Sequence, residues 1–232
     1  MSSLANFNLP QLAQSCSQAS RQVSRLSSTE KNNILQKMAD YLIKDSSLII
    51  NANNADLEQA KKNQLSPAMI DRLVLNSDRL DGMAEALREI ALLPDPVGEI
   101  SSIKTRPNGI QVGYMRIPLG VIAIIYESRP NVTSDAAGLC LKAGNTIILR
   151  GGSEAFFSNQ AIVAALHQAL RDSDLPTECI SFVPTRERQA MTELLKLEYL
   201  QLIRPSKSRK SVIAKKRAEW KKQLLLSKKS ER

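Results

Sequence analysis

The sequence predicts an α/β protein with a helical N-terminal region, a β-hairpin and then a doubly wound parallel sheet. Three observations support this prediction. Apolar residues recur at helical spacing through most of the first 95 residues. An Asn-Gly pair, Asn108-Gly109, then separates two strand-like segments. From residue 120 onward, short apolar runs alternate with helix-length segments, which is the pattern of parallel strands joined by helices.

The N-terminal region is predicted to contain five helices. Apolar side chains at spacings of three or four residues mark the first of them, over residues 9–26. Ser27 and Glu30 form a capping-box pattern for the second, and the third begins near Ser46. Ser66-Pro67 reads as the cap and first residue of another helix. The last, which carries Leu80, Met83, Leu87 and Ile90, stops before Pro94.

The remaining elements follow from changes of hydrophobic period. Alternation at 110–114 and the segment 101–105 predict two antiparallel strands around Asn108-Gly109. The continuous apolar run 120–126 predicts a strand covered on both faces. Three helix-then-strand units follow it, with helices at 132–142, 156–171 and 186–196 and strands at 146–149, 180–183 and 199–203.

Composition and charge exclude several classes of protein. Hydrophobic residues make up 43% and charged residues 24% of the 232 residues, as in ordinary globular proteins. No apolar stretch is long enough to span a membrane and no signal-peptide pattern begins the chain, so we expect a cytoplasmic protein. Three cysteines without CxxC spacing and one histidine make disulfide and metal frameworks implausible.

The net charge of +9 is concentrated at the C-terminus. Residues 204–232 hold 12 basic and two acidic side chains, which leaves 20 basic and 21 acidic side chains in residues 1–203. The last segment no longer follows the strand-helix pattern, so we read it as a basic helix or a disordered tail. A nearly neutral body makes nucleic acid an unexpected partner for the chain as a whole.

Two loops at predicted strand ends could carry chemistry, since ligands of open parallel sheets bind beyond the carboxyl ends of the strands. In the first, residues 127–133, Arg129 offers a forked cation for a substrate anion and Asn131 a neutral donor for a developing oxyanion. The alternative is that Asn131 or Thr133 caps the next helix and Arg129 is solvated.

The second loop, Arg150-Gly151-Gly152-Ser153-Glu154, joins a strand to a helix. Its two glycines would allow the backbone to approach a ribose or phosphate, and Arg150 could meet a ribose 2′-phosphate. It lacks the G-x-G-x-x-G pattern, so a simple turn is the other interpretation. We interpret Cys140 as a small buried apolar residue and His167 as a helix-surface residue, because no acid and nucleophile near them form a relay.

Residues 117–155, IPLGVIAIIYESRPNVTSDAAGLCLKAGNTIILRGGSEA, resemble the gamma-glutamyl phosphate reductases, or glutamate-5-semialdehyde dehydrogenases, of the aldehyde dehydrogenase superfamily. The resemblance extends over about residues 5–203. It implies an incomplete, Rossmann-like sheet of the aldehyde dehydrogenase type. The implied reaction is NADPH-dependent reduction of L-glutamyl 5-phosphate to L-glutamate 5-semialdehyde in proline biosynthesis, by a homo-oligomer with a small-molecule substrate and no membrane partner.

The resemblance also implies roles for individual residues. Tyr126, Glu127 and Ser128 correspond to the loop under the nicotinamide, and Asn131 is the candidate oxyanion donor, although relatives place their asparagine before the proline rather than after it. Residues 150–154 correspond to the loop that contacts the adenosine ribose, here through Arg150, Gly151, Gly152, Ser153 and Glu154. In the family a cysteine thiolate attacks the acyl phosphate.

The chain departs from the family pattern after residue 203. None of its three cysteines stands in the nucleophile context, so we expect residues 1–203 to be the N-terminal part of the cofactor-binding domain and residues 204–232 to be a tail of different origin. On this interpretation the chain is an inactive fragment. The alternatives are a scaffold whose basic tail contacts nucleic acid or an anionic membrane, and a partly folded product whose exposed strand edge promotes aggregation.

Overall fold

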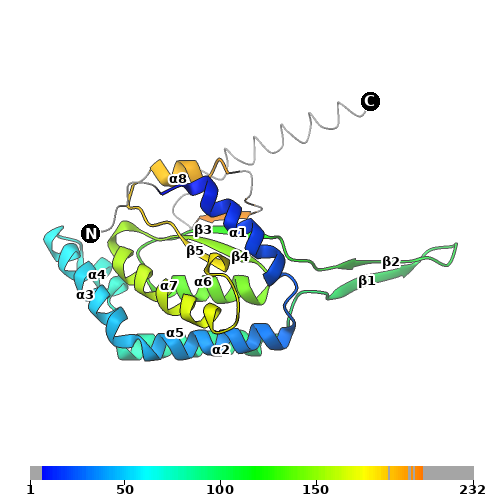
Figure 1. Ribbon diagram of the computed structural model, residues 1–232, viewed down its shortest axis with the longest axis horizontal. Helices are drawn as coiled ribbons and strands as arrows, with labels where there is room; N and C mark the ends of the chain where they lie inside the picture. Colours follow the sequence, from blue (N-terminus) through cyan, green and yellow to red (C-terminus); the bar gives the residue numbers. More distant parts are fainter. Residues whose placement is uncertain (1–6, 188, 198–199, 201, 206–232) are drawn as a thin grey trace.

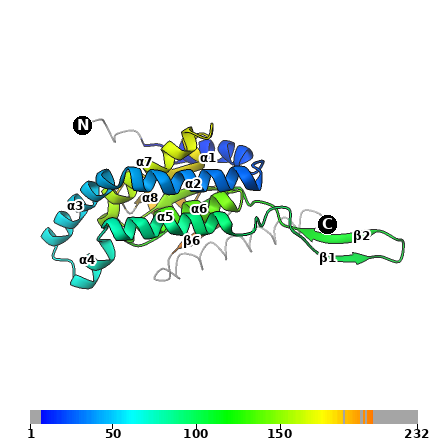
Figure 2. The same ribbon diagram turned by 90° about the horizontal axis from the view of Figure 1, so that it is seen from below.

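The structure, a computed structural model, describes residues 7–187, 189–197, 200 and 202–205. At its centre lies a parallel sheet with helices on both faces, as predicted (Figure 1). Helices α1 and α8 cover one face, and α6 and α7 cover the other. Helices α2 and α5 form a further layer over α6 and α7, which Figure 2 shows from below.

In residues 7–95 the structure has five helices, as the periodicity predicts. The Ser27 side chain accepts a hydrogen bond from the Glu30 amide while the Glu30 carboxylate accepts one from the Ser27 amide, so the capping box is confirmed. Ser66 is the N-cap residue and Pro67 the first helical residue of the fourth helix, as predicted, although the Ser66 side chain makes no hydrogen bond to the helix. The helices are α1 (Leu9–Val23), α2 (Ser28–Lys44), α3 (Ser46–Lys62), α4 (Pro67–Leu73) and α5 (Ser77–Leu92).

The predicted hairpin is present and projects away from the body (Figures 1 and 2). Strand β1 (Ile100–Thr105) pairs antiparallel with β2 (Gln111–Met115), and every residue of both strands is exposed. The loop between the strands, residues 106–110, is longer than the two-residue turn that Asn-Gly favours. Within it, the Gly109 amide donates to the Arg106 carbonyl across Pro107 and Asn108. Gly109 has φ +85°, a conformation that glycine adopts without strain.

Among the described residues, the sheet contains four parallel strands in the order β5-β4-β3-β6. The chain adds β4 and then β5 on one side of β3, and returns to place β6 on the other side. The space beyond the carboxyl ends of β3 and β6 is therefore the topological switch point, where open α/β sheets bind ligands. The strands are β3 (Val121–Ile125), β4 (Thr146–Arg150), β5 (Ile180–Phe182) and β6 (Leu202–Pro205), and the helices between them are α6 (Asn131–Lys142), α7 (Phe156–Arg171) and α8 (Gln189–Leu194).

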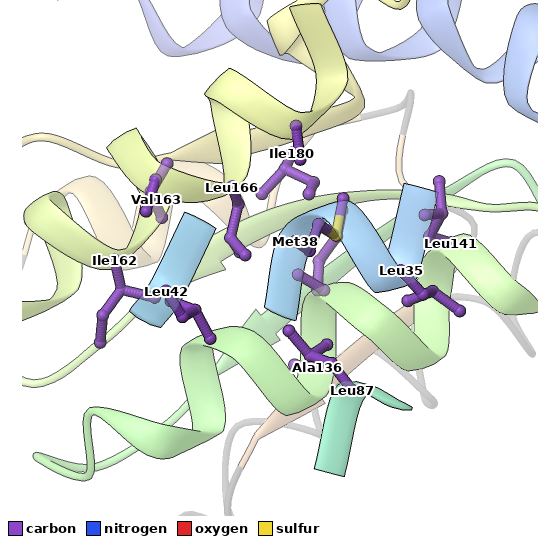
Figure 3. Close-up of a cluster of buried hydrophobic side chains, with 14 of the residues drawn as sticks. Leu35, Met38, Leu42, Leu87, Ala136, Leu141, Ile162, Val163, Leu166 and Ile180 are labelled. Atoms are coloured by element: carbon purple, nitrogen blue, oxygen red, sulfur yellow. The ribbon is translucent and has the colours of Figure 1, made fainter. Parts of the chain in front are cut away.

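Apolar side chains of the strands point alternately to the two faces, which explains the continuous apolar runs. Val121, Ala123 and Ile125 pack toward Leu9 and Ala13 of α1. The other face joins α6, α7, α2 and α5 in a large cluster, part of which is drawn in Figure 3: Leu35, Met38, Leu42, Leu87, Ala136, Leu141, Ile162, Val163, Leu166 and Ile180. This cluster packs α6 and α7 against the sheet, and both helices begin at the two loops of the candidate site.

The C-terminal elements differ in extent from the prediction. Helix α8 covers Gln189–Leu194 rather than 186–196, and β6 runs two residues beyond 203 to Pro205. Proline is tolerated there because β6 is an edge strand within the part of the chain that the structure describes. The basic segment 206–232 lies outside the described residues. In the described part, no helix is both long and apolar enough to cross a membrane.

Candidate functional site at the carboxyl edge of the sheet

The two loops that the sequence singles out lie against each other at the carboxyl edge of the sheet. Tyr126 follows β3, and its amide donates to the Arg150 carbonyl at 3.1 Å, which extends the β3–β4 ladder by one bond. The Ser128 hydroxyl then donates to Glu154 Oε2 across the gap between the loops. Ser128 and Glu154 are half-buried, whereas Glu127 and Ser153 are exposed. The structure thus brings residues 126–128 and 150–154 together, as the prediction requires.

Both glycines of the second loop are required by this close approach. A Cβ atom on Gly151 would lie 2.2 Å from Asn159 Nδ2 and 3.1 Å from the Tyr126 ring. A Cβ atom on Gly152 would lie 2.2 Å from Ser128 Oγ and 2.9 Å from the Ser128 amide nitrogen. Neither glycine has a positive φ, so the space between the loops, and not the backbone conformation, demands glycine.

A buried chain of polar groups holds the first loop from beneath. Thr133 donates to Asn159 Oδ1 at 2.9 Å, so its hydroxyl oxygen receives the proton of the Tyr126 hydroxyl 2.7 Å away. Burial raises the pKa of Tyr126 far above its usual value, and the phenol is therefore a neutral donor. These bonds connect the end of β3 to the first turns of α6 and α7. Thr133 is consequently a core residue, and the interpretation that it caps α6 is wrong.

Arg150 points away from the loop surface. Its side chain donates to the Gly151 carbonyl and, through Nη2, to the carbonyls of Arg186 and Glu187 at 3.3 and 3.4 Å. Only 8% of the residue is exposed. Arg150 thus connects the end of β4 to the loop that follows β5.

A pocket of about 500 Å³ opens beside the first loop. One wall comes from residues 71–86 of α4 and α5, and the other comes from Arg129, Pro130, Asn131 and Asp135. The Arg79 guanidinium is already paired with Asp71, at 2.8 Å from its carboxylate, whereas Arg129 is exposed at the mouth. The pocket is therefore lined by apolar side chains together with cationic and amide donors and two carboxylates, the exposed Asp71 and the half-buried Asp135.

Asn131 lies at the first position of α6 and faces this pocket. Its amide donates to Asp135 Oδ2 at 3.3 Å, one helical turn further along. Burial raises the pKa of Asp135, and the bond from Asn131 opposes that shift. Pro130 occupies the cap position and no side chain caps α6, so the interpretation of Asn131 as a cap is wrong as well.

None of the three cysteines lies at this site. Burial raises the pKa of Cys16 to about 11 and that of Cys140 and Cys179 to about 12. A thiol of this kind is protonated at neutral pH and does not act as a nucleophile. Cys140 is buried, as predicted.

His167 is not the surface residue that we predicted. It is half-buried, and its Nε2 donates to the Ile180 carbonyl at 2.6 Å. Burial is the largest cause of its lowered pKa, so the ring is a neutral structural donor between α7 and β5.

Several residues of the site were missed by the sequence analysis. Asp135 could have been found from its spacing, because a residue four positions after Asn131 shares its helix face. Asn159 carried a weaker signal, a polar residue inside the apolar stripe of a helix. The α4–α5 wall of the pocket gave no signal, since it is brought to α6 only by tertiary packing.

Comparison with known proteins agrees with this architecture. Residues 6–224 match the aldehyde dehydrogenase family. Over 195 residues, 84% of the chain, the sequence is 53% identical to gamma-glutamyl phosphate reductase of Salinibacter ruber, of which it covers 45%. The chain therefore spans about half the length of the curated relatives it matches.

Solved structures give the same result. The crystal structure of gamma-glutamyl phosphate reductase from Thermotoga maritima superposes with a TM-score of 0.83 at 38% identity, over 86% of this chain and 48% of that one. The Saccharomyces cerevisiae enzyme of the same name gives a TM-score of 0.78 at 26% identity, over 88% of this chain and 53% of that one.

Proposed function

Since the chain belongs to the aldehyde dehydrogenase family, we propose that it is the cofactor- and substrate-holding part of a reductase that converts L-glutamyl 5-phosphate into L-glutamate 5-semialdehyde with NADPH. This is a step of proline biosynthesis. The observation that carries the proposal is the junction of the two loops that follow β3 and β4 at the carboxyl edge of the sheet, with a pocket beside it. The 53% identity to a gamma-glutamyl phosphate reductase supports the substrate class.

The residues present fit a nicotinamide dinucleotide. Side chains of Tyr126, Ser128 and Asn159 pack closely against Gly151 and Gly152, so at these two positions only backbone atoms of the second loop are available to a ribose or phosphate. On our proposal, Ser153 and Glu154 meet the adenosine ribose, and residues 126–128 lie under the nicotinamide. When bound, the cofactor supplies a hydride. Glu154 suits a ribose hydroxyl because bonds from Ser128 and Ser153 overcome its burial and hold its pKa low.

We assign the pocket to the substrate. Arg129 would bind one of the substrate's anionic groups, because a guanidinium offers paired donors to a carboxylate or phosphate. Asn131 would donate to the acyl oxygen as negative charge develops on it, which lowers the barrier. Asp135 holds the Asn131 amide through the bond at 3.3 Å.

The acyl-transfer step also needs a thiolate. The three cysteines of this sequence are buried and have raised pKa values. We therefore propose that residues 1–203 position the cofactor and the substrate, and that the nucleophile belongs to the part of the relatives that this chain does not match.

We further propose that a second copy of the chain packs on the hairpin. Its strands expose Ile100, Ile103, Val112, Tyr114 and Met115, each by 45% or more. An exposed apolar hairpin of this kind is typical of a surface that is covered in an assembly. The resemblance to homo-oligomeric reductases makes a like subunit the partner of choice.

A titration with NADPH, followed by the fluorescence of its nicotinamide, tests the cofactor site. We expect saturable binding to the chain, and we expect Ser128→Ala to weaken it about fivefold, since one lost hydrogen bond between the loops is worth ~1 kcal/mol. Ser24→Ala is the matched control, because the Ser24 hydroxyl donates only to the Arg21 carbonyl on the surface of α1. Absence of NADPH binding by the folded chain would contradict the proposal.

A further inference from the structure

The contacts of Arg150 leave open which cation would bind the ribose 2′-phosphate, the group that distinguishes NADPH from NADH. Arg150 is buried, and its guanidinium donates to three backbone carbonyls. To reach a ribose at the surface of its own loop, it would have to abandon the contacts that connect β4 to the loop after β5. Its position is that of a structural cation.

Arg186 lies at the other end of those contacts and is exposed. Its guanidinium carbon lies 5.0 Å from the centre of the Phe156 ring and 4.8 Å from that of Phe157. The two rings meet edge to face at 5.6 Å, so they form a fixed platform at the start of α7. Phe156 directly follows the turn Ser153–Ala155. Arg186 is therefore beside the loop to which we assign the adenosine ribose.

The charges around Arg186 leave it available for an anion. Among the residues that the structure describes, Arg186 forms no ion pair. The nearby Asp56 is 2% exposed, and it accepts bonds from the Phe157 and Ser158 amides and from the Ser158 hydroxyl. Glu154 accepts bonds from Ser128 and Ser153. The carboxylates of Asp56 and Glu154 thus accept hydrogen bonds from groups other than Arg186.

We propose that Arg186 binds the 2′-phosphate of the adenosine ribose and so gives this site its preference for NADPH over NADH. The inference rests on the proposed function, because it presumes that a nicotinamide dinucleotide occupies the carboxyl edge of the sheet. A guanidinium placed over two aromatic rings suits this task, since the rings attract the cation without using its N–H groups, which can donate in pairs to phosphate oxygens. Fixing the side chain in advance also lowers the entropy that is lost on binding.

The test compares 2′,5′-ADP with 5′-AMP, two fragments that differ only in the 2′-phosphate, by calorimetric titration of the full chain. We expect the wild type to bind 2′,5′-ADP roughly tenfold or more tightly than 5′-AMP, as paired charge-assisted bonds imply. Arg186→Gln is expected to remove that preference and leave 5′-AMP binding unchanged. Arg186→Lys is expected to retain part of it, since the charge stays and the paired donors are lost. Arg25→Gln, at an exposed arginine of the turn after α1, removes the same charge and should change neither affinity.

Three results would overturn the inference. The first is equal binding of the two fragments by the wild type, and the second is an undiminished preference in Arg186→Gln. The third is failure of the folded chain to bind either fragment. Binding of 5′-AMP separates these cases, because a chain that binds 5′-AMP without preference keeps the proposed adenosine site and loses only the role of Arg186. A chain that binds neither loses both.

Discussion

Burial controls the chemistry of individual side chains in this protein more than sequence neighbours do. Cys16 shows the effect clearly, since its thiol donates to the Glu178 carbonyl at 3.0 Å, far along the chain, and has a pKa raised to about 11. The Tyr126 hydroxyl is likewise enclosed and donates to Thr133. Such groups are parts of the core, although each would be a plausible reactive group on a surface.

The cysteines provide a direct test at this scale. At about pH 8 we expect iodoacetamide to modify none of the three thiols in the folded chain and all three in denaturant, because the thiolate is the reacting form. Mass spectrometry counts the adducts. Rapid modification of one thiol in the folded chain would reveal a reactive cysteine and would contradict the assignment of the nucleophile to another part of the relatives.

The same pKa shifts predict sensitivity to alkali. The folded pKa of Cys16 lies above its unfolded value, so its contribution to stability is fully present below about pH 9 and is lost as the pH rises toward 11. We expect the free energy of unfolding to fall over this range, as measured by urea denaturation. A Cys16→Ala variant should show a smaller decrease than the wild type, and an equal decrease would rule out the thiol as its cause.

A second residue-scale prediction concerns the pair of Lys31 and Asp95, which are 1% and 11% exposed and 2.8 Å apart. Burial opposes ionisation of Asp95, but bonds from Lys31, the Val97 amide and Ser28 outweigh it and hold its pKa below the usual value. Lys31→Ala should cost about 3 kcal/mol in urea unfolding, because it leaves a largely buried carboxylate without its partner.

Arg88→Ala is the matched control for this experiment. It removes exposed ion pairs with Asp40 and Glu85 and should lower the free energy of unfolding by less than about 1 kcal/mol. The stability that the Lys31 pair provides should be present above the unfolded aspartate pKa of ~3.9 and be lost as the pH falls through the lower folded value. Equal losses of unfolding free energy in Lys31→Ala and Arg88→Ala would contradict the proposal that burial makes the Lys31–Asp95 pair the stronger one.

At the scale of elements, the periodicity of the sequence predicted the strand-helix units well. Residues 120–183 alternate as expected because each strand is covered on both faces, so that its sequence is apolar throughout. Details that depend on side-chain direction could not be predicted. The Ser66 hydroxyl leaves its helix uncapped, and Arg150 turns toward a loop that follows a different strand. Only packing between distant segments decides such directions.

The hairpin yields a prediction about assembly. We expect the chain to self-associate with rising concentration in sedimentation velocity, and we expect Tyr114→Lys to reduce the association tenfold or more, at roughly 1.4 kcal/mol per tenfold. Tyr114 is 76% exposed and contributes little to the core, so the melting temperature should not change. Thr105→Lys adds the same charge at an exposed polar position of β1 and serves as the control. A wild type that remains monomeric at all concentrations would contradict the proposed role of the hairpin.

The whole molecule has a layered design in which the pocket that we assign to the substrate and the loops that we assign to the cofactor share the segment 126–131. Helices α4 and α5 supply one wall of the pocket, and the first turn of α6 supplies the other. The two loops were predicted from their place after strands, but the pocket was not, because its walls lie about 50 residues apart in sequence. The site therefore depends on the packing of the N-terminal helices on α6.

We predict no reductase turnover by this chain alone. Incubated with L-glutamate 5-semialdehyde, phosphate and NADP⁺, it should produce no NADPH absorbance above that of buffer, because the three cysteines are buried, protonated thiols. The NADPH titration described above provides the control that the chain is folded. A rate proportional to the concentration of the chain would refute this prediction.

The position of α1 also matters during synthesis on the ribosome. Its Cys16 thiol lies 3.7 Å from the Ile147 carbonyl, which is 131 residues later in the chain, and 3.0 Å from that of Glu178. At about 5–20 residues per second, the nascent helix waits roughly ten seconds for the strand that will cover its apolar side. During this delay the apolar face of α1 is accessible to chaperones and to neighbouring nascent chains, because the strand that covers it is translated much later.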